Sequence, residues 1–464
     1  MSNGFLGRGL KVPAKASLWY TVSGALAKGV GLLFTPIFTR IMSRGEYGRY
    51  TLYITVLALM SVVCTSGVTG SAMYKGLIEF SDGRRKFTAS AVGLSLCTVI
   101  PVCLAVFLLR GVLLIEGIFV PFLFIQLIFD IGIAAMCAEL KYSYSYGKAA
   151  AVNAVCALLS PAVSILIMAL IKGAFARILG LLLVSGIVAV PFIVRCIKEG
   201  LFRWEGWKFI LRYSLPLLPG TLAAAVISQA DKLIVSAYMG SEALAPYAVA
   251  HSIGVGLTFI TASLGSALHP WIMRKLKSGE VGKVGETVGR IYVTLGALTV
   301  ILTALAPEAL SLLTPESYSV ALPAVFPIAM ATLPAFLLSV GTVVGVYEGR
   351  SYLSSAALVT GAAVNIGVNL LLVPRLEYLG AGLSLLLSYA TAALVIYLLP
   401  SGRRVIGEIG VGGILKATAL TAAVAAVTVA FYGSLPARLL LLILPVGALI
   451  FSAVGMKEYV TESY

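Results

Sequence analysis

The first long apolar run of the chain contains a lysine, Lys28, about eleven residues from its start. At ~1.5 Å per residue this places the ammonium group close to the middle of a membrane. A charge in the hydrocarbon core normally faces a cavity or a partner, so we interpret Lys28 as an anion site. The alternative is that Lys28 pairs with a carboxylate to hold two helices together. Small and polar residues share its helical face: Thr21, Gly24, Gly31 and Thr35.

A carboxylate, Asp130, lies in the inner half of the fourth apolar run, with Gln126 one helical turn away on the same face. The helical rise places Asp130 within about 6 Å of the depth of Lys28. Two interpretations follow. Lys28 and Asp130 form a structural ion pair, or they form an ion-coupling pair that opens during a transport cycle. The remaining alternative is that the two side chains never meet.

Polar residues also occur in the seventh apolar run and in the loop that follows the first apolar run. Gln229, Asp231 and Lys232 lie toward the outer side, where the adjacent opposite charges indicate either a satisfied helix-end pair or a gate between two halves of the chain. Arg40 begins an outer loop that also carries Arg44 and Arg49. These cations either steer an anionic ligand or simply remain solvated.

Motifs of soluble and membrane enzymes are missing from the sequence. There is no HExxH, GxSxG or Walker A sequence, and the six cysteines have no metal-ligand spacing. His251 and His269 are isolated, so we expect both to be helix-packing residues. No loop between apolar runs exceeds about 20 residues, which argues against an enzyme with an extramembrane domain. We therefore expect a protein that is not an enzyme and has neither a metal nor another cofactor.

The composition indicates the class of protein. Hydrophobic residues make up 59% of the 464 residues, charged residues only 11%, and the mean hydropathy is +1.01. A soluble domain is about 25% charged, so this chain cannot cover a water-exposed surface. The composition predicts an all-α polytopic membrane protein. The net charge of +15 then reflects basic cytoplasmic loops and contact with anionic membrane lipids, with no nucleic-acid partner.

Fourteen apolar runs are long enough to span a bilayer. With both termini in the cytoplasm, 24 of the 34 Lys and Arg lie inside and nine outside, and Lys28 lies within the first span. This split satisfies the positive-inside rule and predicts a multi-pass protein of the cytoplasmic membrane. The predicted spans are 17–39, 50–73, 88–109, 116–138, 149–171, 178–194, 214–237, 246–269, 291–313, 320–346, 352–373, 379–399, 414–432 and 437–455.

A weak internal repeat relates the first span to the seventh. Ser17–Tyr50 aligns without gaps to Ser214–Tyr247, and such similarity is typical of transporters built from repeats. Six spans separate the copies, so both enter the membrane from the same side. We expect two six-helix lobes, residues 1–200 and 201–400, related by a pseudo-two-fold axis along the membrane normal. Residues 401–464 add two helices.

Three stretches, 31–56, 214–254 and 361–389, resemble the polysaccharide transport family of oligosaccharide flippases. That family shares a superfamily with the multidrug and toxin extrusion antiporters and the lipid II flippases. Met42 replaces the leucine that is usual in the first motif. The motif residues are Thr39, Arg40, Met42, Tyr47 and Gly48 in the first stretch, Asp231 and Lys232 in the second, and Asn365, Asn369, Pro374 and Gly380–Gly382 in the third.

The resemblance implies a flippase that carries a polyprenyl-diphosphate-linked oligosaccharide, of the kind used for lipopolysaccharide O-antigen, from the inner to the outer leaflet by alternating access. Transport would be coupled to H⁺ or Na⁺, with a glycan polymerase or other export machinery as a possible partner. Lipid II flippase and multidrug or cation antiporter are the alternatives within the superfamily. A membrane glycan polymerase or ligase is a further alternative from another class of protein.

Overall fold

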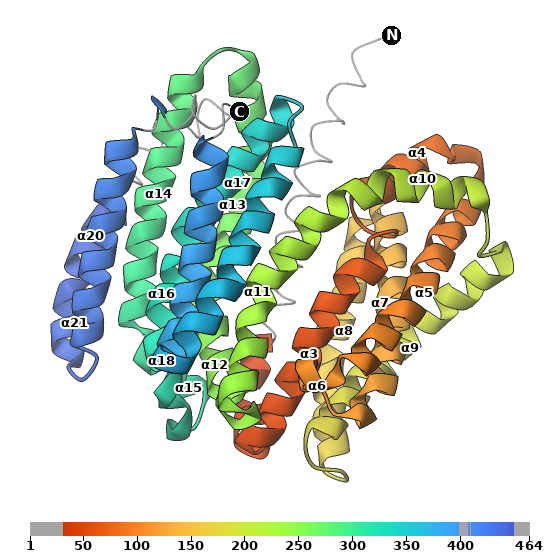
Figure 1. Ribbon diagram of the computed structural model, residues 1–464, viewed down its shortest axis with the longest axis horizontal. Helices are drawn as coiled ribbons and strands as arrows, with labels where there is room; N and C mark the ends of the chain where they lie inside the picture. Colours follow the sequence, from red (N-terminus) through yellow and green to blue (C-terminus); the bar gives the residue numbers. More distant parts are fainter. Residues whose placement is uncertain (1–30, 399–406, 409, 450–464) are drawn as a thin grey trace. The chain divides into compact units, whose positions relative to one another are not determined.

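The computed structural model describes residues 31–398, 407–408 and 410–449, and no β-strand occurs among them (Figure 1). Eleven helices within these residues are long and apolar enough to cross a membrane. Two shorter apolar helices, Gly31–Ile41 and Leu435–Leu449, accompany them. The elements are α3 (Arg44–Thr65), α4 (Gly70–Glu79), η1 (Ser81–Gly83), α5 (Arg84–Leu108), α6 (Arg110–Leu113), η2 (Gly117–Phe119), α7 (Val120–Tyr142), α8 (Tyr146–Met168), α9 (Ala174–Glu199), α10 (Trp204–Ser214), η3 (Leu215–Leu217), α11 (Leu218–Met239), α12 (Ser241–Gly254), η4 (Val255–Leu257), α13 (Thr258–Lys277), α14 (Val281–Ala304), α15 (Ala306–Leu313), η5 (Glu316–Ala324), α16 (Val325–Met330), α17 (Thr332–Tyr347), α18 (Tyr352–Leu398), α20 (Val411–Ala430) and α21 (Leu435–Leu441).

The helix α18 contains two of the predicted spans. Its backbone leaves the helical region at Glu377, where φ is 48° and ψ is −125°. A Cβ added at Gly361 would lie 2.9 Å from the carbonyl oxygen of Ser388. This close approach shows that the two halves of α18 fold back on each other. With α18 divided there, the described helices correspond to all fourteen predicted spans, although the first and last spans extend beyond the described residues. The predicted fold class is confirmed.

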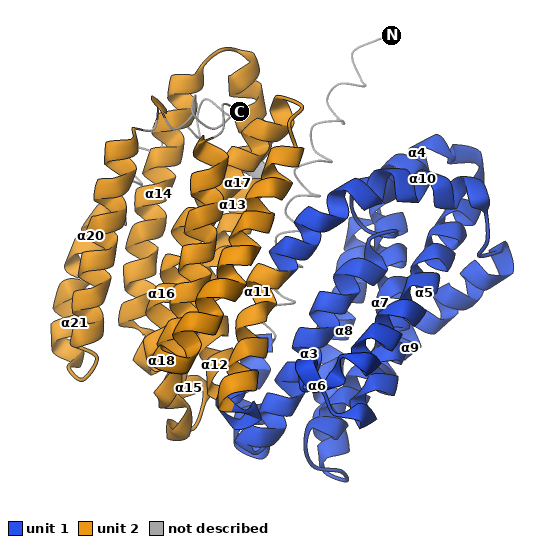
Figure 2. Cartoon of the chain, viewed as in Figure 1, with its two compact units in different colours: residues 1–225, 240–245 blue, residues 226–239, 246–464 orange. Residues whose placement is uncertain are grey.

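The chain forms two compact units (Figure 2). Unit 1 contains residues 1–225 and 240–245, and unit 2 contains residues 226–239 and 246–464. The division falls inside α11, whereas the sequence placed the boundary between the lobes at residue 200. The assignment of lobes to residues 1–200, 201–400 and 401–464 stays a prediction.

Unit 1 is organised around α7, which packs against α3, α5, α8 and α9. At one end of this unit, the Glu46 carboxylate accepts a hydrogen bond from the backbone N–H of Ala174 (2.7 Å), and Arg49 forms an ion pair with Glu116 (3.0 Å). Alternate loops therefore meet at the same end, as the predicted topology requires. The contacts at the opposite end join Lys75 to Tyr213, Ser90 to Arg203, and Glu139 to Arg195.

In unit 2, α14 and α20 run in the same direction. The hydroxyls of Tyr292 and Thr418 are 2.6 Å apart, and one turn further along both helices a Cβ at Gly296 would lie 2.6 Å from Oγ1 of Thr421. Two helices that run in the same direction through one membrane must have an odd number of spans between them. The three spans between them, formed by α16–α17 and the two halves of α18, supply the required reversals. The cytoplasmic location of both termini stays a prediction.

Candidate functional site

Lys28 lies outside the described residues, and its pairing with Asp130 stays a prediction. Asp130 itself lies halfway along α7. The Gln126 side-chain amide donates a hydrogen bond to Asp130 Oδ1 (2.7 Å), and its nitrogen is also 3.2 Å from the hydroxyl of Ser185 on α9. The predicted shared face of Gln126 and Asp130 is thus observed. Among the described residues, no Lys or Arg forms an ion pair with Asp130.

A cavity of about 440 Å³ lies next to Asp130, within unit 1. Residues from α3, α4, α7 and α8 line it, so it is formed by four different helices. A polar cavity within helices of this apolar composition can bind the polar part of a ligand that crosses the membrane. The polar side chains that line it are those of Ser61, Thr65, Thr69, Tyr74, Asp130, Lys141 and Asn153.

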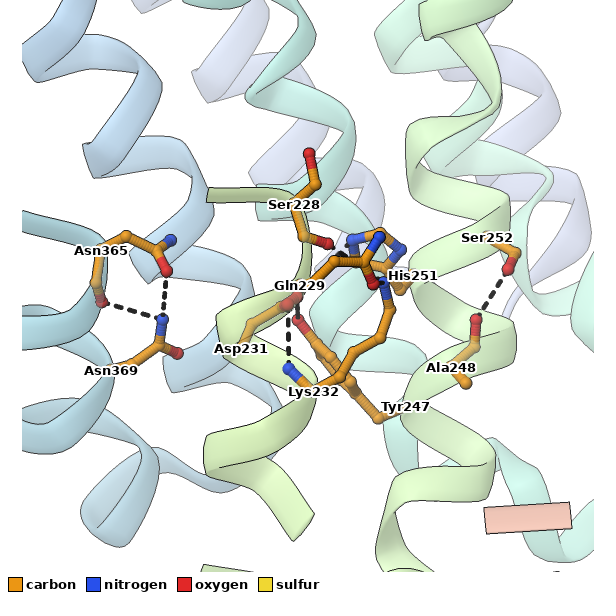
Figure 3. Close-up of polar contacts among 10 residues, drawn as sticks. All are labelled: Ser228, Gln229, Asp231, Lys232, Tyr247, Ala248, His251, Ser252, Asn365 and Asn369. Atoms are coloured by element: carbon orange, nitrogen blue, oxygen red, sulfur yellow. Dashed lines mark hydrogen bonds and ion pairs between the residues drawn. The ribbon is translucent and has the colours of Figure 1, made fainter. Parts of the chain in front are cut away.

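A second buried carboxylate, Asp231, lies on α11 in unit 2 and is fully buried (Figure 3). The Tyr247 hydroxyl donates a hydrogen bond to Asp231 Oδ2 (2.5 Å), and Nε2 of His251 is 3.5 Å from the same oxygen. Both partners lie on α12. Tyr247, itself 0% exposed, also stacks on the ring of Tyr378, with ring centroids 6.4 Å apart. Asp231 is therefore held by α12 inside a packed aromatic environment.

The neighbouring charge, Lys232, does not form the expected pair with the Asp231 carboxylate. Its ammonium group donates hydrogen bonds to the Ser228 carbonyl oxygen (3.1 Å) and to Gln229 Oε1 (2.9 Å), both one turn back on α11 (Figure 3). Only the Lys232 backbone N–H contacts the Asp231 side chain (2.9 Å). Successive residues on a helix point about 100° apart, so adjacent charges on α11 face different neighbours. The simple interpretation as an adjacent-charge pair is wrong.

Sequence reasoning missed Tyr247 and His251 as partners of Asp231. His251 was expected to be an isolated helix-packing residue; it is buried, and its ring lies beside Tyr247 and Asp231. The sequence contains a signal for this contact in Gly240, which makes the turn between α11 and α12 with a φ of 85°. In an antiparallel helix pair, residues at similar distances from the turn lie opposite each other, and Asp231 and Tyr247 flank Gly240 in this way. The i, i+4 spacing of Tyr247 and His251 then places both on one face.

Two asparagines of the third motif, Asn365 and Asn369, are completely buried on α18. The Asn369 side-chain amide donates to the Asn365 backbone carbonyl (2.9 Å) and lies 3.1 Å from its side-chain oxygen. These bonds lie within one helix. A close packing seam lies beside them, since Gly361 approaches the Ser388 backbone closely.

The arginines that the sequence assigns to the outer side differ in their surroundings. Arg40 is exposed and donates a hydrogen bond to the carbonyl oxygen of Pro36 (3.0 Å). Arg49 is held by Glu46 (2.8 Å) and Glu116 (3.0 Å) and is therefore not a free cation. A further arginine, Arg177 on α9, lies over two aromatic rings, with its guanidinium carbon 3.3 Å from the Phe38 centroid and 4.4 Å from the Tyr50 centroid.

An ion pair that local spacing could not predict connects α15 to α21. The Arg438 guanidinium, buried in unit 2, donates two hydrogen bonds to the Glu308 carboxylate (2.6 and 2.7 Å) and one to the Ala304 carbonyl oxygen (2.5 Å). Glu308 lies beyond the end of the α14 span. The Arg438 hydrogen bonds hold the pKa of Glu308 below its usual value. The C-terminal helices are therefore attached to the rest of unit 2 by a pH-sensitive contact.

We expect Glu308→Gln to lower the midpoint of thermal unfolding in detergent by several degrees at pH 7. The change removes the partner of a buried cation, at a cost reduced to about 2 kcal/mol by the exposure of the carboxylate. Because the pKa of Glu308 is lowered on folding, its contribution is complete above about pH 4.3 and is lost as the pH falls through the lowered pKa. As the pH is lowered, the unfolding midpoint of Glu308→Gln should therefore fall less than that of the wild type. Glu316→Gln, at an exposed glutamate, is the control, and identical midpoints and pH profiles for all three proteins would contradict this role.

Comparison with known proteins places these features in a family. Residues 14–275, more than half of the chain, match the family model described as "Polysaccharide biosynthesis protein". No curated protein matches the chain in sequence.

Solved structures with similar folds are transporters. The lipid II flippase MurJ in an inward closed conformation is 13% identical, with a TM-score of 0.70, over 96% of this chain and 99% of that chain. An inward-facing multidrug resistance MATE family transporter is 13% identical, with a TM-score of 0.63, over 88% and 98% of the two chains. A MOP superfamily transporter from Pyrococcus furiosus, with a binding pocket described as having reverse polarity, is 15% identical, with a TM-score of 0.56, over 89% and 98%.

These identities establish the fold alone, which is the two-lobe transporter fold common to the MurJ and MATE structures. The family match goes further, because it covers the first two motif-bearing stretches, with the Asp231 cluster in the second, and also covers Asp130. The chain belongs to the polysaccharide biosynthesis protein family and has the fold of the flippases and transporters of the MOP superfamily.

Proposed function

We propose that this protein carries a polyprenyl-diphosphate-linked oligosaccharide from the inner to the outer leaflet of the cytoplasmic membrane by alternating access of two lobes. The observation that carries this proposal is the polar cavity beside Asp130 in unit 1 of a chain of the polysaccharide biosynthesis family. A lipid-linked glycan needs such a cavity, because its sugars and diphosphate cannot enter hydrocarbon unaided. Its polyprenyl chain can remain in the membrane.

Lys28 supplies the positive charge that this substrate requires. A diphosphate crossing the membrane needs a cation, and the sequence places Lys28 near the depth of Asp130. On the helix that the sequence predicts, Lys28 shares a face with Thr21 and Thr35, and we infer that this polar face admits water. Lys28 then binds the diphosphate while the polar groups of the cavity bind the sugars.

We expect Lys28→Arg to retain part of the transport and Lys28→Met to lose almost all of it, because the charge matters more than the shape of the side chain. The measurement is leaflet exchange of lipid-linked oligosaccharide in reconstituted vesicles, normalised to folded protein. Transport by Lys28→Met at the wild-type rate would show that Lys28 is not the anion site.

Ion coupling is the second part of the proposal, and we assign it to Asp231. This carboxylate is fully buried, and its contacts with the Tyr247 hydroxyl and the His251 ring give it neighbours that can donate and accept protons. Release or uptake of H⁺ or Na⁺ at a buried carboxylate changes the charge balance beside Lys232. Such a change can shift a conformational equilibrium because it alters the relative free energies of two states.

Lipid II flipping is the second candidate function. The lipid II flippase MurJ has the same fold over nearly the whole chain, and lipid II is also a polyprenyl-diphosphate-linked glycan. The two functions use the same chemistry and differ in the glycan. Export of organic cations is a weaker candidate, because Lys141 lines the same cavity as Asp130 and offsets its negative charge.

A further inference from the structure

The cavity beside Asp130 has a distinct pattern of hydrogen-bonding groups. The hydroxyls of Ser61, Thr65 and Thr69 lie on one face of the α3 region, and each donates its proton to a backbone carbonyl, at 3.1, 2.7 and 2.8 Å. Each hydroxyl oxygen therefore remains available as an acceptor. Asp130 uses Oδ1 for Gln126 and keeps Oδ2 as a further acceptor. This side of the cavity offers acceptors to a ligand.

Groups that can donate lie on the other helices around the cavity. Asn153 on α8 accepts a weak hydrogen bond from the Cys137 thiol through its side-chain oxygen (3.8 Å), so its amide NH₂ is the part that can donate. Tyr74 adds an aromatic ring with a hydroxyl. Lys141 lies in the last turn of α7, at the end that the sequence predicts to be cytoplasmic, and lines the same cavity. The lining thus has one carboxylate, one ammonium group and several neutral polar groups.

This pattern fits sugar hydroxyls better than either charged ligand. A phosphate has only acceptor oxygens at neutral pH, and it would face Asp130 and three acceptor hydroxyls. An organic cation would gain Asp130 but also face Lys141. A saccharide hydroxyl both donates and accepts, so it can donate to Asp130 or Thr65 and accept from Asn153. The volume of about 440 Å³ lies in the range of small-molecule sites, about 300–1,000 Å³.

We propose that this cavity is a saccharide subsite, in which Asp130, Thr65 and Thr69 accept hydrogen bonds from hydroxyl groups of the transported glycan and Asn153 donates to one. The inference rests on the proposed function. It adds that the sugar and the diphosphate are recognised by different residues, the sugar by this cavity and the diphosphate by Lys28. Residues of this cavity then select among glycans.

The test measures binding to the purified full chain in lipid nanodiscs, with two probes. One is polyprenyl diphosphate that carries a monosaccharide, and the other is polyprenyl diphosphate without sugar. Asp130→Asn should weaken binding of the sugar-bearing lipid about tenfold or more, because a charge-assisted hydrogen bond is lost. Binding of the bare diphosphate should change by less than about twofold.

Thr65→Val provides a milder variant with a matched control. It should weaken binding of the sugar-bearing lipid about fivefold, the value expected for one neutral hydrogen bond. Thr55→Val is the control, because Thr55 is also on α3 and also donates to the carbonyl four residues back (2.8 Å), yet it does not line the cavity. Thr55→Val should bind both probes as the wild type does.

The outcomes separate this inference from the function on which it rests. If the wild type binds neither lipid, the proposed function fails and the subsite fails with it. If the wild type binds both and Asp130→Asn and Thr65→Val leave sugar-dependent binding unchanged, or weaken both lipids equally, the subsite alone is wrong. Binding of tetraphenylphosphonium that Asp130→Asn abolishes, with lipid binding unchanged, would assign the cavity to cations.

Discussion

Replacement of Gly48 by alanine is expected to leave little folded protein in the membrane. A Cβ at this position of α3 would lie 1.7 Å from the carbonyl oxygen of Ser241, the first residue of α12, and 2.7 Å from its carbonyl carbon. Both contacts are with backbone atoms, so no side-chain rotation can relieve them. Overpacking in a protein interior costs about 1–3 kcal/mol even where side chains can move, and a backbone clash costs more.

Gly45→Ala is the matched control for this change. It lies on the same helix and against the same first turn of α12, but its Cβ would meet only the Glu242 side chain, at an ordinary 3.5 Å. We expect Gly45→Ala to match the wild type in folded yield and in the midpoint of thermal unfolding by size-exclusion chromatography after heating. Equal yields for Gly48→Ala and Gly45→Ala would show that the α3 contact with the turn is not needed for folding.

Asp231→Asn is expected to abolish the response of transport to an ion gradient while leaving passive leaflet exchange. Asparagine retains an oxygen that can accept the Tyr247 hydrogen bond, so the α11–α12 contact survives. It cannot bind or release a proton, nor offer a charge to Na⁺. Without a gradient, exchange should remain within a factor of about two of wild type.

The measurement is leaflet exchange in vesicles with an imposed pH gradient, an imposed Na⁺ gradient, or neither. Ser236→Ala, which alters another buried polar residue of α11, should respond to the gradient as the wild type does. A gradient response retained by Asp231→Asn would move the coupling site elsewhere. Loss of exchange under all three conditions, in folded protein, would assign Asp231 to the transport path itself.

The features that the sequence predicted are those that depend on short-range spacing or on composition. The helices follow from apolar runs of sufficient length, and the break at Glu377 separates two runs that hydropathy had already divided. The hydrogen bond between Gln126 and Asp130 follows from i, i+4 geometry on one helix. In each case the information lies within a few turns of the chain.

The features that were missed depend on which helices pack together. The contact between Asp231 and Tyr247 requires the antiparallel packing of α11 on α12, and the pair of Glu308 and Arg438 requires α21 to lie against the end of α14. The motif glycine Gly48 could be recognised as unusual, but its reason is a backbone contact with a distant turn. Spacing about Gly240 indicates the first of these contacts, but no spacing along the chain gives the contact of Glu308 with Arg438 or that of Gly48 with Ser241.

The central claim is that the protein moves a lipid-linked glycan between leaflets, and leaflet exchange of defined substrates tests it most directly. Purified protein is reconstituted into vesicles with fluorescent polyprenyl-diphosphate-linked oligosaccharide, lipid II, or tetraphenylphosphonium, and movement is followed by quenching or release. The account predicts exchange of the lipid-linked oligosaccharide that depends on protein and is lost in Lys28→Met, with no transport of the cation. Transport of tetraphenylphosphonium without exchange of either lipid-linked glycan would contradict it.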